Sequence, residues 1–224
     1  IKDTKNGKFY FYLNQINGIN TSEVLPDIIN EIIDSFVWPK SQRWAYSELR
    51  WARPLRNILL LLNNQLVEGK VAIDKNNSLY FSNYTFGHRH DSKKIEVRSI
   101  DDYESLLEKN KVILDRDKRR NKIVSDTKLL LKDKSIKLLD DDHLLDEILG
   151  LIEFPNVLIG SIDPKFMNLP KEVLTTAMRV HQKYFSIIDN KNNIVPKFLF
   201  VSNTIPEKER DKSIIEGNER VLKA

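Results

Sequence analysis

The segment HQKYF, which begins at His181, places an imidazole, an amide, an ammonium group and a phenol within one short stretch. Such a set can supply a general acid or base, but catalysis normally needs a second titratable group that orients the first. The sequence shows no such partner for His181. A structural interpretation is therefore favoured, with the aromatic residues in the core and the polar residues near the start of a strand. The residues concerned are His181, Gln182, Lys183, Tyr184 and Phe185.

Two histidines in the segment GHRH, His88 and His90, have a spacing that puts both on one side of a strand and could begin a metal site. A third ligand would have to come from a residue far away in the sequence. We therefore assign no metal ligand and no catalytic residue. A turn at Gly87 beside a polar strand is favoured instead, with Arg89 free to bind a carboxylate or a phosphate.

The segment RWAYSELRWARPLR, residues 43–56, interleaves arginines with aromatic residues. Guanidinium groups pair with phosphates and aromatic faces stack on bases, so this segment is the best RNA-binding candidate by composition. Aromatic packing with the arginines in structural ion pairs stays open as the alternative. A second basic run, residues 116–122, is interrupted by acids and is interpreted as a solvated helix face. The candidate RNA-binding residues are Arg43, Trp44, Arg50, Arg53, Arg89 and Lys183.

The composition favours a globular protein, because 41% of the 224 residues are hydrophobic and 30% are charged. A net charge of +4 with a pI near 9.0 suits a polyanion such as RNA, although the excess is modest. The chain has no cysteine and begins at Ile1 without an initiator Met or an export signal, which favours a reducing cytoplasm. Its longest apolar run, ILLLL, is far shorter than the roughly 20 residues of a membrane-spanning helix. No phosphate-binding glycine loop, GxSxG motif or HExxH motif occurs.

Hydrophobic periodicity and turn residues predict the order of the structural elements. In the first part of the chain we expect a strand over residues 8–18, a helix that Thr21 or Ser22 caps and Pro39 ends, and a hairpin over residues 57–73 with its turn at Asn63 and Asn64. In the second part we expect a helix near Ser99, a buried strand at residues 111–115, helices over residues 115–134 and 142–152, a strand at residues 156–162, a helix from Pro170 to His181, a hairpin turn at residues 189–193 and a helix from about Pro206.

These elements predict an α+β fold with a mixed sheet and flanking helices. The expected division is an N-terminal hairpin and helix in residues 1–40, a main α+β domain in residues 41–205 and a helix in residues 206–224.

Several of these segments, in this order, resemble the beta subunit of the bacterial heterotetrameric glycyl-tRNA synthetase. The resemblance runs from about Trp38 to Ala224 and is weaker before that. It is carried by Arg43-Trp44, Arg53-Pro54, Gly87-His88-Arg89, the segments LLDEILGLIEFP and LPKEVL, Met178, the segment HQKYF, Pro196, Phe198, the segment VSN that ends at Asn203, and GNERV from Gly217. The family-motif residues that it suggests for structural roles are Pro54, Gly87, His88, His181, Gln182, Tyr184, Phe185, Asn203, Gly217, Asn218 and Glu219.

The resemblance implies an internal piece of a longer subunit that continues into an HD-type helical domain and C-terminal RNA-binding domains. It also implies a fold similar to the editing-type module of the phenylalanyl-tRNA synthetase beta chain. Aminoacylation with ATP and Mg²⁺ is then expected in the separate alpha subunit, with no cofactor in this segment. The implied partners are the alpha subunit and tRNA-Gly, with neither DNA nor a membrane among them.

The leading hypothesis is that this segment, within a glycine–tRNA ligase, contributes to tRNA-Gly binding and placement and to subunit assembly. A hydrolytic editing domain for misacylated tRNA is the alternative from another class, with a pocket near His88, His90 or His181. A purely architectural module that touches neither substrate is the third reading that stays open.

Overall fold

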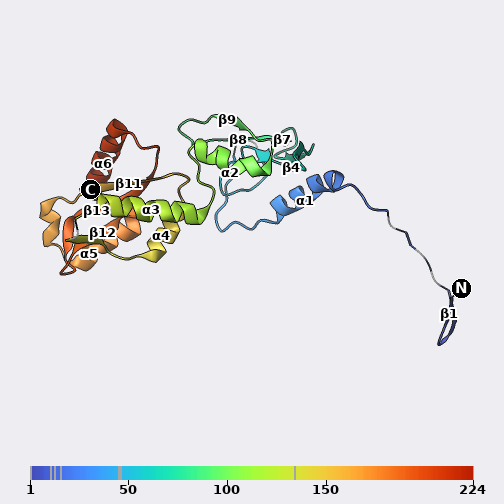
Figure 1. Ribbon diagram of the computed structural model, residues 1–224, viewed down its shortest axis with the longest axis horizontal. Coiled ribbons are helices and arrows are strands. Elements are labelled where there is room, and N and C mark those ends of the chain that lie inside the picture. Colours follow the sequence, from blue (N-terminus) through green and yellow to red (C-terminus); the bar gives the residue numbers. More distant parts are fainter. Residues whose placement is uncertain are drawn as a thin grey trace. The chain divides into compact units, whose positions relative to one another are not determined.

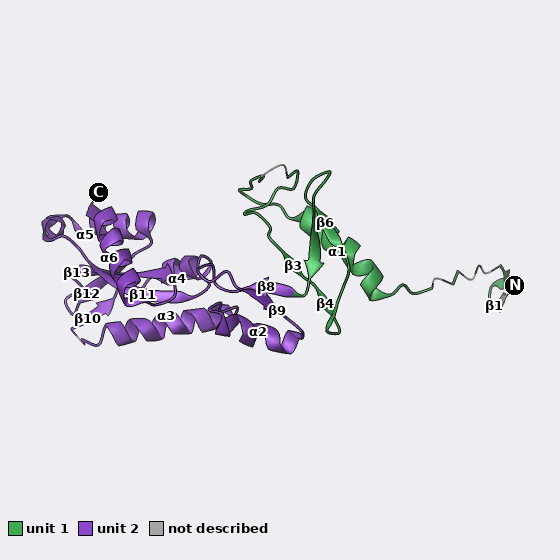
Figure 2. Cartoon of the chain, turned by 90° about the horizontal axis from the view of Figure 1, so that it is seen from above, with its two compact units in different colours: residues 1–83 green, residues 84–224 purple. Residues whose placement is uncertain are grey.

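The computed structural model describes residues 2–10, 12, 14–15, 17–44, 47–133 and 135–223. Contacts between residues divide the chain into two compact units, residues 1–83 and residues 84–224 (Figure 2). This division differs from the bounds expected at residues 40 and 205. The reason is that the first helix packs on strands that follow it, whereas the last helix packs on the sheet of the second unit. No helix in the described ranges is long and apolar enough to cross a membrane.

Unit 1 combines one helix with short strands around a small core. The helix is α1 (Thr21–Ser35), and the core consists of Ile33, Val71 and Phe81. A three-stranded mixed sheet has the order β3-β7-β6, with β3 parallel to β7 and β6 antiparallel to it. The strands of unit 1 are β1 (Lys2–Thr4), β2 (Gly7–Phe9), β3 (Ile58–Leu59), β4 (Leu61–Leu62), β5 (Gln65–Leu66), β6 (Lys70–Ala72) and β7 (Ser78–Ser82). The pairs β1-β2 and β4-β5 form two hairpins outside the three-stranded sheet.

The turn between β4 and β5 confirms the hairpin expected at Asn63 and Asn64. Both residues have positive φ, 51° and 64°, which is the combination that a two-residue type I′ turn requires and that asparagine tolerates. Leu62 pairs with Gln65 directly across this turn.

Helix α1 differs from expectation at both ends. Asn20 occupies the N-cap position in place of Thr21 or Ser22. At the other end the helix stops at Ser35, before Pro39, because Phe36 turns to an extended backbone and its ring contacts two tryptophan rings.

The strand expected over residues 8–18 is wrong beyond Phe9, where β2 ends. The rest of that stretch, so far as it is described, contains neither helix nor strand. Tyr10 and Tyr12 are 89% and 90% exposed. Neither side chain packs against a surface that would bury one face of a strand, so the alternation of aromatic residues does not produce one. Phe11, Leu13 and Ile16 lie outside the described residues.

Unit 2 is built on a four-stranded antiparallel sheet with the order β10-β12-β13-β11, of which Figure 1 labels β11, β12 and β13. The strands are β10 (Ile136–Leu138), β11 (Pro155–Ser161), β12 (Phe185–Asp189) and β13 (Ile194–Asn203). A hairpin of β8 (Tyr84–Phe86) and β9 (Lys94–Glu96), followed by α2 (Ile100–Lys109), precedes the sheet. The remaining helices are α3 (Arg116–Leu130), α4 (Asp142–Leu149), the 3-10 helix η1 (Pro164–Asn168), α5 (Lys171–Thr176), the π-helix η2 (Ala177–Gln182) and α6 (Lys208–Lys223).

Side-chain alternation along β13 gives the sheet of unit 2 two buried faces. Leu199 joins a core with α3 and α4, whereas Phe198 and Phe200 join a second core with α5, η2 and α6. The sheet therefore lies between two helical layers. The structure as a whole is a mixed α/β fold with several small sheets and six α-helices among the described residues.

Most elements of unit 2 confirm the expectation, including the Ser99 cap of α2 and the hairpin between β12 and β13. Residues 111–115 form no strand, because Asp115 instead caps α3 by accepting a hydrogen bond from the Lys118 backbone N–H at 2.8 Å. The helix expected over residues 142–152 ends at Leu149. The helix after Pro170 changes to π geometry at Ala177, which apolar spacing does not signal.

Candidate functional site

The arginine–aromatic segment of unit 1 forms a loop whose two ends are joined. The backbone N–H of Gln42 donates to the Trp51 carbonyl at 2.9 Å, and the Trp51 N–H donates back at 3.2 Å. Within the loop, the buried hydroxyl of Ser47 lies 3.2 and 3.3 Å from the carbonyl oxygens of Leu49 and Ile73. The described part of the loop is thus anchored at its base and in its middle. Ala45 and Tyr46 lie outside the described residues.

Aromatic packing fixes the base of this loop. The rings of Phe36, Trp38 and Trp51 contact one another with centroid distances of 4.9 to 5.4 Å. Trp51 therefore has a packing role, while Trp44 is half-buried. The structure confirms the aromatic packing of the alternative interpretation at Trp51, whereas RNA binding by this segment stays a prediction.

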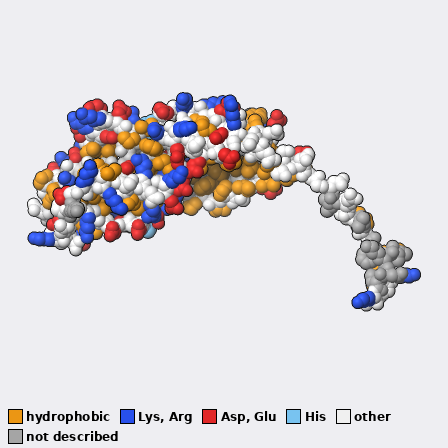
Figure 3. Space-filling view, viewed as in Figure 1, with side chains coloured by type: hydrophobic (Ala, Val, Ile, Leu, Met, Phe, Trp, Pro, Cys, Tyr) orange, Lys and Arg blue, Asp and Glu red, His pale blue; other side chains and the backbone are white. Residues whose placement is uncertain are grey.

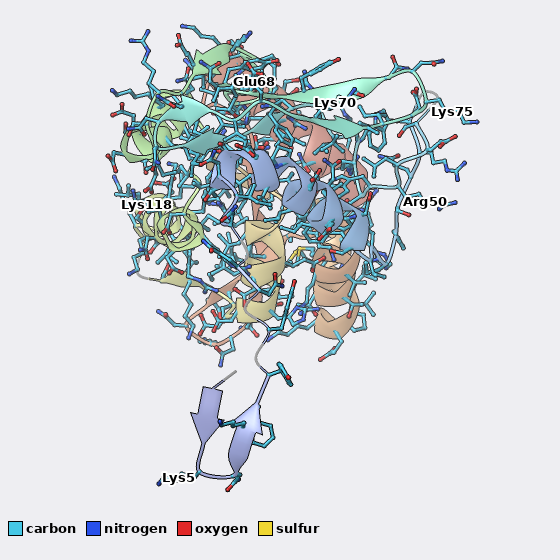
Figure 4. All side chains as sticks on the ribbon, turned by 90° about the vertical axis from the view of Figure 1, so that its right-hand side faces the viewer. Lys5, Arg50, Glu68, Lys70, Lys75 and Lys118 are labelled. Carbon is cyan, nitrogen blue, oxygen red and sulfur yellow. The ribbon has the colours of Figure 1, made fainter. Side chains whose placement is uncertain are left out.

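Three arginines of this segment are exposed and have no partner among the described residues. Arg43, Arg50 and Arg53 make no hydrogen bond or ion pair with any described residue. Arg50 and Lys75 line a hollow of about 500 Å³ whose apolar wall includes Leu49. Figure 4 shows Arg50 and Lys75 projecting on the same side of unit 1. An unpaired guanidinium on an anchored loop can bind a phosphate without first breaking an internal ion pair.

Four basic residues in the first half of α3 in unit 2, Arg116, Lys118, Arg120 and Lys122, are, in contrast, already held in ion pairs. Lys118 lies 2.8 Å from Glu108 and 2.9 Å from Glu104, and the hydrogen bonds to Glu108 and then Glu104 raise the pKa of Lys118. Arg116 pairs with Asp146 at 3.3 Å. Figure 3 shows acidic and basic side chains interspersed over unit 2. The run at residues 116–122 is thus an ion-paired helix face.

The two remaining RNA-binding candidates, Arg89 and Lys183, belong to unit 2. Arg89 is exposed in the turn between β8 and β9. Lys183 has a left-handed backbone with φ of 60° directly after η2, and its ammonium group lies 2.8 Å from Glu147. Lys183 therefore already has a carboxylate partner on α4.

Three segments that are far apart in the sequence meet at Asn203, at the end of β13. Its side-chain oxygen accepts hydrogen bonds from the backbone N–H groups of Glu153 and Phe154, both at 3.1 Å. The ring nitrogen Nε2 of His88 lies 3.2 Å from the same oxygen, and His88 is completely buried. Because an amide oxygen only accepts, this contact requires that Nε2 carry the hydrogen. Gly87 is required beside it, because an added Cβ would lie 2.9 Å from Asn110 Cβ.

A second cluster joins the segment HQKYF to α6. The Tyr184 hydroxyl donates to Asn218 Oδ1 at 2.6 Å, and burial raises the pKa of Tyr184. Glu219 accepts a hydrogen bond from the Ser161 N–H at 2.7 Å, which ties α6 to β11. Tyr184 and Phe185 are buried, as the sequence predicts.

The histidines do not converge on a site. Among the ranges that the structure describes, no three His, Asp or Glu side chains are placed to hold a metal ion. The His90 ring stacks on His88 at 5.1 Å; loss of water around it, and then the charges of His88, Arg210 and Arg89, lower the pKa of His90. His181 is exposed at the end of η2, and the half-buried Gln182 lines a hollow of about 190 Å³ there.

Comparison with known proteins identifies the class of this chain. Residues 1–224 match the family described as glycyl-tRNA synthetase beta subunit, a family of aminoacyl-tRNA synthetase subunits. The chain belongs to this family.

Individual relatives carry the same description. The glycine–tRNA ligase beta subunit of Rickettsia bellii (strain OSU 85-389) is 40% identical over 220 residues, which are 98% of this chain and 32% of that protein. That of Rickettsia canadensis (strain McKiel) is 41% identical over 220 residues, with the same shares of both chains. That of Rickettsia felis is 40% identical over 222 residues, again 98% of this chain and 32% of the relative. The chain therefore spans about a third of the length of these curated relatives.

Proposed function

We propose that this chain works as part of a glycine–tRNA ligase, in which the loop of unit 1 contacts the phosphate backbone of tRNA-Gly and unit 2 is a scaffold for placement and assembly. The observation that carries this proposal is the contrast between the two units. Arg43, Arg50 and Arg53 are exposed without a partner among the described residues, whereas Arg116, Lys118, Arg120 and Lys122 of α3 are held in ion pairs.

The anchoring of the loop supports this assignment. A guanidinium on a loop that is already fixed loses less conformational freedom on binding than one on a free segment. The bridge between Gln42 and Trp51 fixes the base, with Arg43 and Arg50 directly inside it. Arg53 follows the bridge, so a single RNA strand passing the base of the loop has three cations within reach.

The motif residues of unit 2 support the scaffold role. Asn203, His88 and Tyr184 use their polar atoms for contacts inside unit 2, so these atoms are already committed to holding the fold. We place aminoacylation with ATP and Mg²⁺ in the separate alpha subunit of a heterotetramer in the cytoplasm, with no cofactor bound by this chain.

Replacing Arg50 and Arg53 together with Glu tests the proposal in the whole enzyme. The KM for tRNA-Gly should rise at least about tenfold, because two charge-assisted phosphate contacts become repulsive, and kcat at saturating tRNA should change little. A control variant with Lys191→Glu and Lys212→Glu changes the charge equally at exposed positions of unit 2 and should leave the KM near its original value. An unchanged KM in the Arg50 and Arg53 variant would remove both residues from the interface.

Hydrolytic editing is the second candidate function. The π-helix η2 supports this candidate, since π-helices often occur at functional sites. This editing role would rest on the fold similarity to the editing-type module that the family resemblance implies. The exposed His181, next to Gln182 at the hollow, would supply the accessible imidazole. Release of the amino acid from mischarged tRNA-Gly, lost on His181→Ala, would favour editing over the scaffold role.

A further inference from the structure

Helix α1 of unit 1 carries an apolar stripe that the described residues leave exposed. One side of α1 packs on the core through Ile29 and the buried Ile33. Another side carries Ile28 and Ile32, which are 42% and 46% exposed, and Phe36 follows one turn later at the end of the helix with 51% exposed. A spacing of four residues places these last three on one side of α1, and we call them the α1 stripe. Exposed apolar residues that gather in this way are typical of an interaction surface, whereas single ones are ordinary.

A row of acidic residues runs along α1 beside this stripe. Glu23, Asp27 and Glu31 have the same spacing of four, and α1 contains no basic residue. Glu23 accepts a hydrogen bond from the Asn20 amide at 2.7 Å, whereas Asp27 and Glu31 make no hydrogen bond or ion pair with any described residue. The fourth acid of the helix, Asp34, lies instead at the hollow of unit 1. Like charges four residues apart destabilise a helix, so the acidic row brings the free chain no stability.

The stripe and the acidic row together define the chemistry of the partner. RNA and anionic lipid surfaces are polyanions, which Asp27 and Glu31 repel, so the partner is a protein. A second copy that docked through its own α1 would bring these acids against each other, because a symmetric contact uses the same patch twice. An amphipathic helix can lay apolar residues along such a stripe and place Lys or Arg at its edge. The surface therefore fits a basic amphipathic helix of a different chain.

We propose that the α1 stripe docks a basic amphipathic helix of the alpha subunit. This inference rests on the proposed function, which takes the alpha subunit as a partner, and it adds a contact on unit 1 to the scaffold role of unit 2. The apolar side of the partner helix covers Ile28, Ile32 and Phe36. Its Lys or Arg side chains pair with Asp27 and Glu31, which removes the repulsion between these two carboxylates.

The association of the whole beta subunit with the alpha subunit, measured by sedimentation velocity, tests this contact. The double variant Ile28→Ser with Ile32→Ser should raise the dissociation constant at least about tenfold, because two apolar anchors of the contact are lost. The control is Val173→Ser with Val180→Ser, which changes two side chains of unit 2 that are 52% and 48% exposed. This control should change the dissociation constant by less than about twofold, as surface substitutions outside an interface do.

A charge reversal at Glu31 separates docking from folding. Glu31→Lys replaces the repulsion with Asp27 by an attractive pair four residues apart, so the melting temperature of the beta subunit should not fall. The dissociation constant should nevertheless rise at least about fivefold, because the cations of the partner helix now meet a lysine. This effect should shrink as the salt concentration rises.

The outcomes distinguish this inference from the proposed function. The variants of α1 should leave the KM for tRNA-Gly near its original value at saturating alpha subunit, whereas the Arg50 and Arg53 variant should keep its affinity for the alpha subunit. Unchanged alpha binding in the Ile28 and Ile32 variant and in Glu31→Lys would overturn the docking proposal. So would a loss of tRNA affinity or of beta self-association in place of alpha binding. A lower melting temperature with unchanged alpha binding would contradict it as well, because another part of the beta subunit would then cover the stripe.

Discussion

Replacing Asn203 with Leu should lower the free energy of unfolding of unit 2 by about 3 kcal/mol, because one amide oxygen serves three donors. Leucine has a similar size but accepts no hydrogen bond. The completely buried His88 ring would lose the partner of Nε2, and the N–H groups of Glu153 and Phe154 would have to find water. Urea unfolding followed by far-UV circular dichroism measures the loss.

The matched control for this prediction is Asn203→Asp, which keeps an acceptor oxygen in place. Its loss of stability should be clearly smaller than that of the Leu variant. All three tryptophans of the chain lie in unit 1, so tryptophan fluorescence does not replace circular dichroism here. Equal losses in the two variants would mean that side-chain shape, and not hydrogen bonding, holds the three segments together.

Replacing Gly160 with Ala should also destabilise the chain strongly, by about 3 kcal/mol, through steric overlap. Gly160 on β11 faces Phe198 on β13, and an added Cβ would lie 2.5 Å from the Cζ atom of Phe198. The Phe198 ring cannot move aside easily, because it is completely buried and stacks on Tyr184 at 4.5 Å. Thermal unfolding of the variant measures the effect.

Gly217 gives the opposite expectation and serves as the control. It lies inside α6, and a Cβ added there meets no atom within 4 Å. Gly217→Ala should therefore stabilise the chain by up to about 1 kcal/mol through helix propensity. A loss of stability at Gly217, or none at Gly160, would show that the packing between β11 and β13 differs from the structure described.

The elements that the sequence predicts well are those with local signals. Ser99 and Asp115 bond to backbone N–H groups two or three residues away, and Asn63 with Asn64 forms its turn alone. The strand predictions around Tyr10 and at residues 111–115 were wrong, because strand formation depends on distant residues and not on local signals alone. A short apolar run becomes a strand only if another strand pairs with it, and a distant part of the chain decides that.

The same difference between local and long-range signals applies to the candidate site. Composition marks the arginines at residues 43–56 as RNA-binding candidates, but only the structure shows that Trp51 packs and that Arg50 is unpaired. The meeting of His88 and Asn203, which are 115 residues apart, has no local signal.

The most direct test of RNA contact by unit 1 is a titration of this chain with labelled tRNA-Gly and with an unrelated tRNA at two salt concentrations. We predict tighter binding of tRNA-Gly that weakens steeply as salt rises. The slope of log K against log salt should fall by about one for each of Arg43, Arg50 and Arg53 that is replaced by Gln. Equal binding of the two tRNAs, or none, would contradict the proposal and assign tRNA recognition to the parts of the longer relatives that this chain does not match.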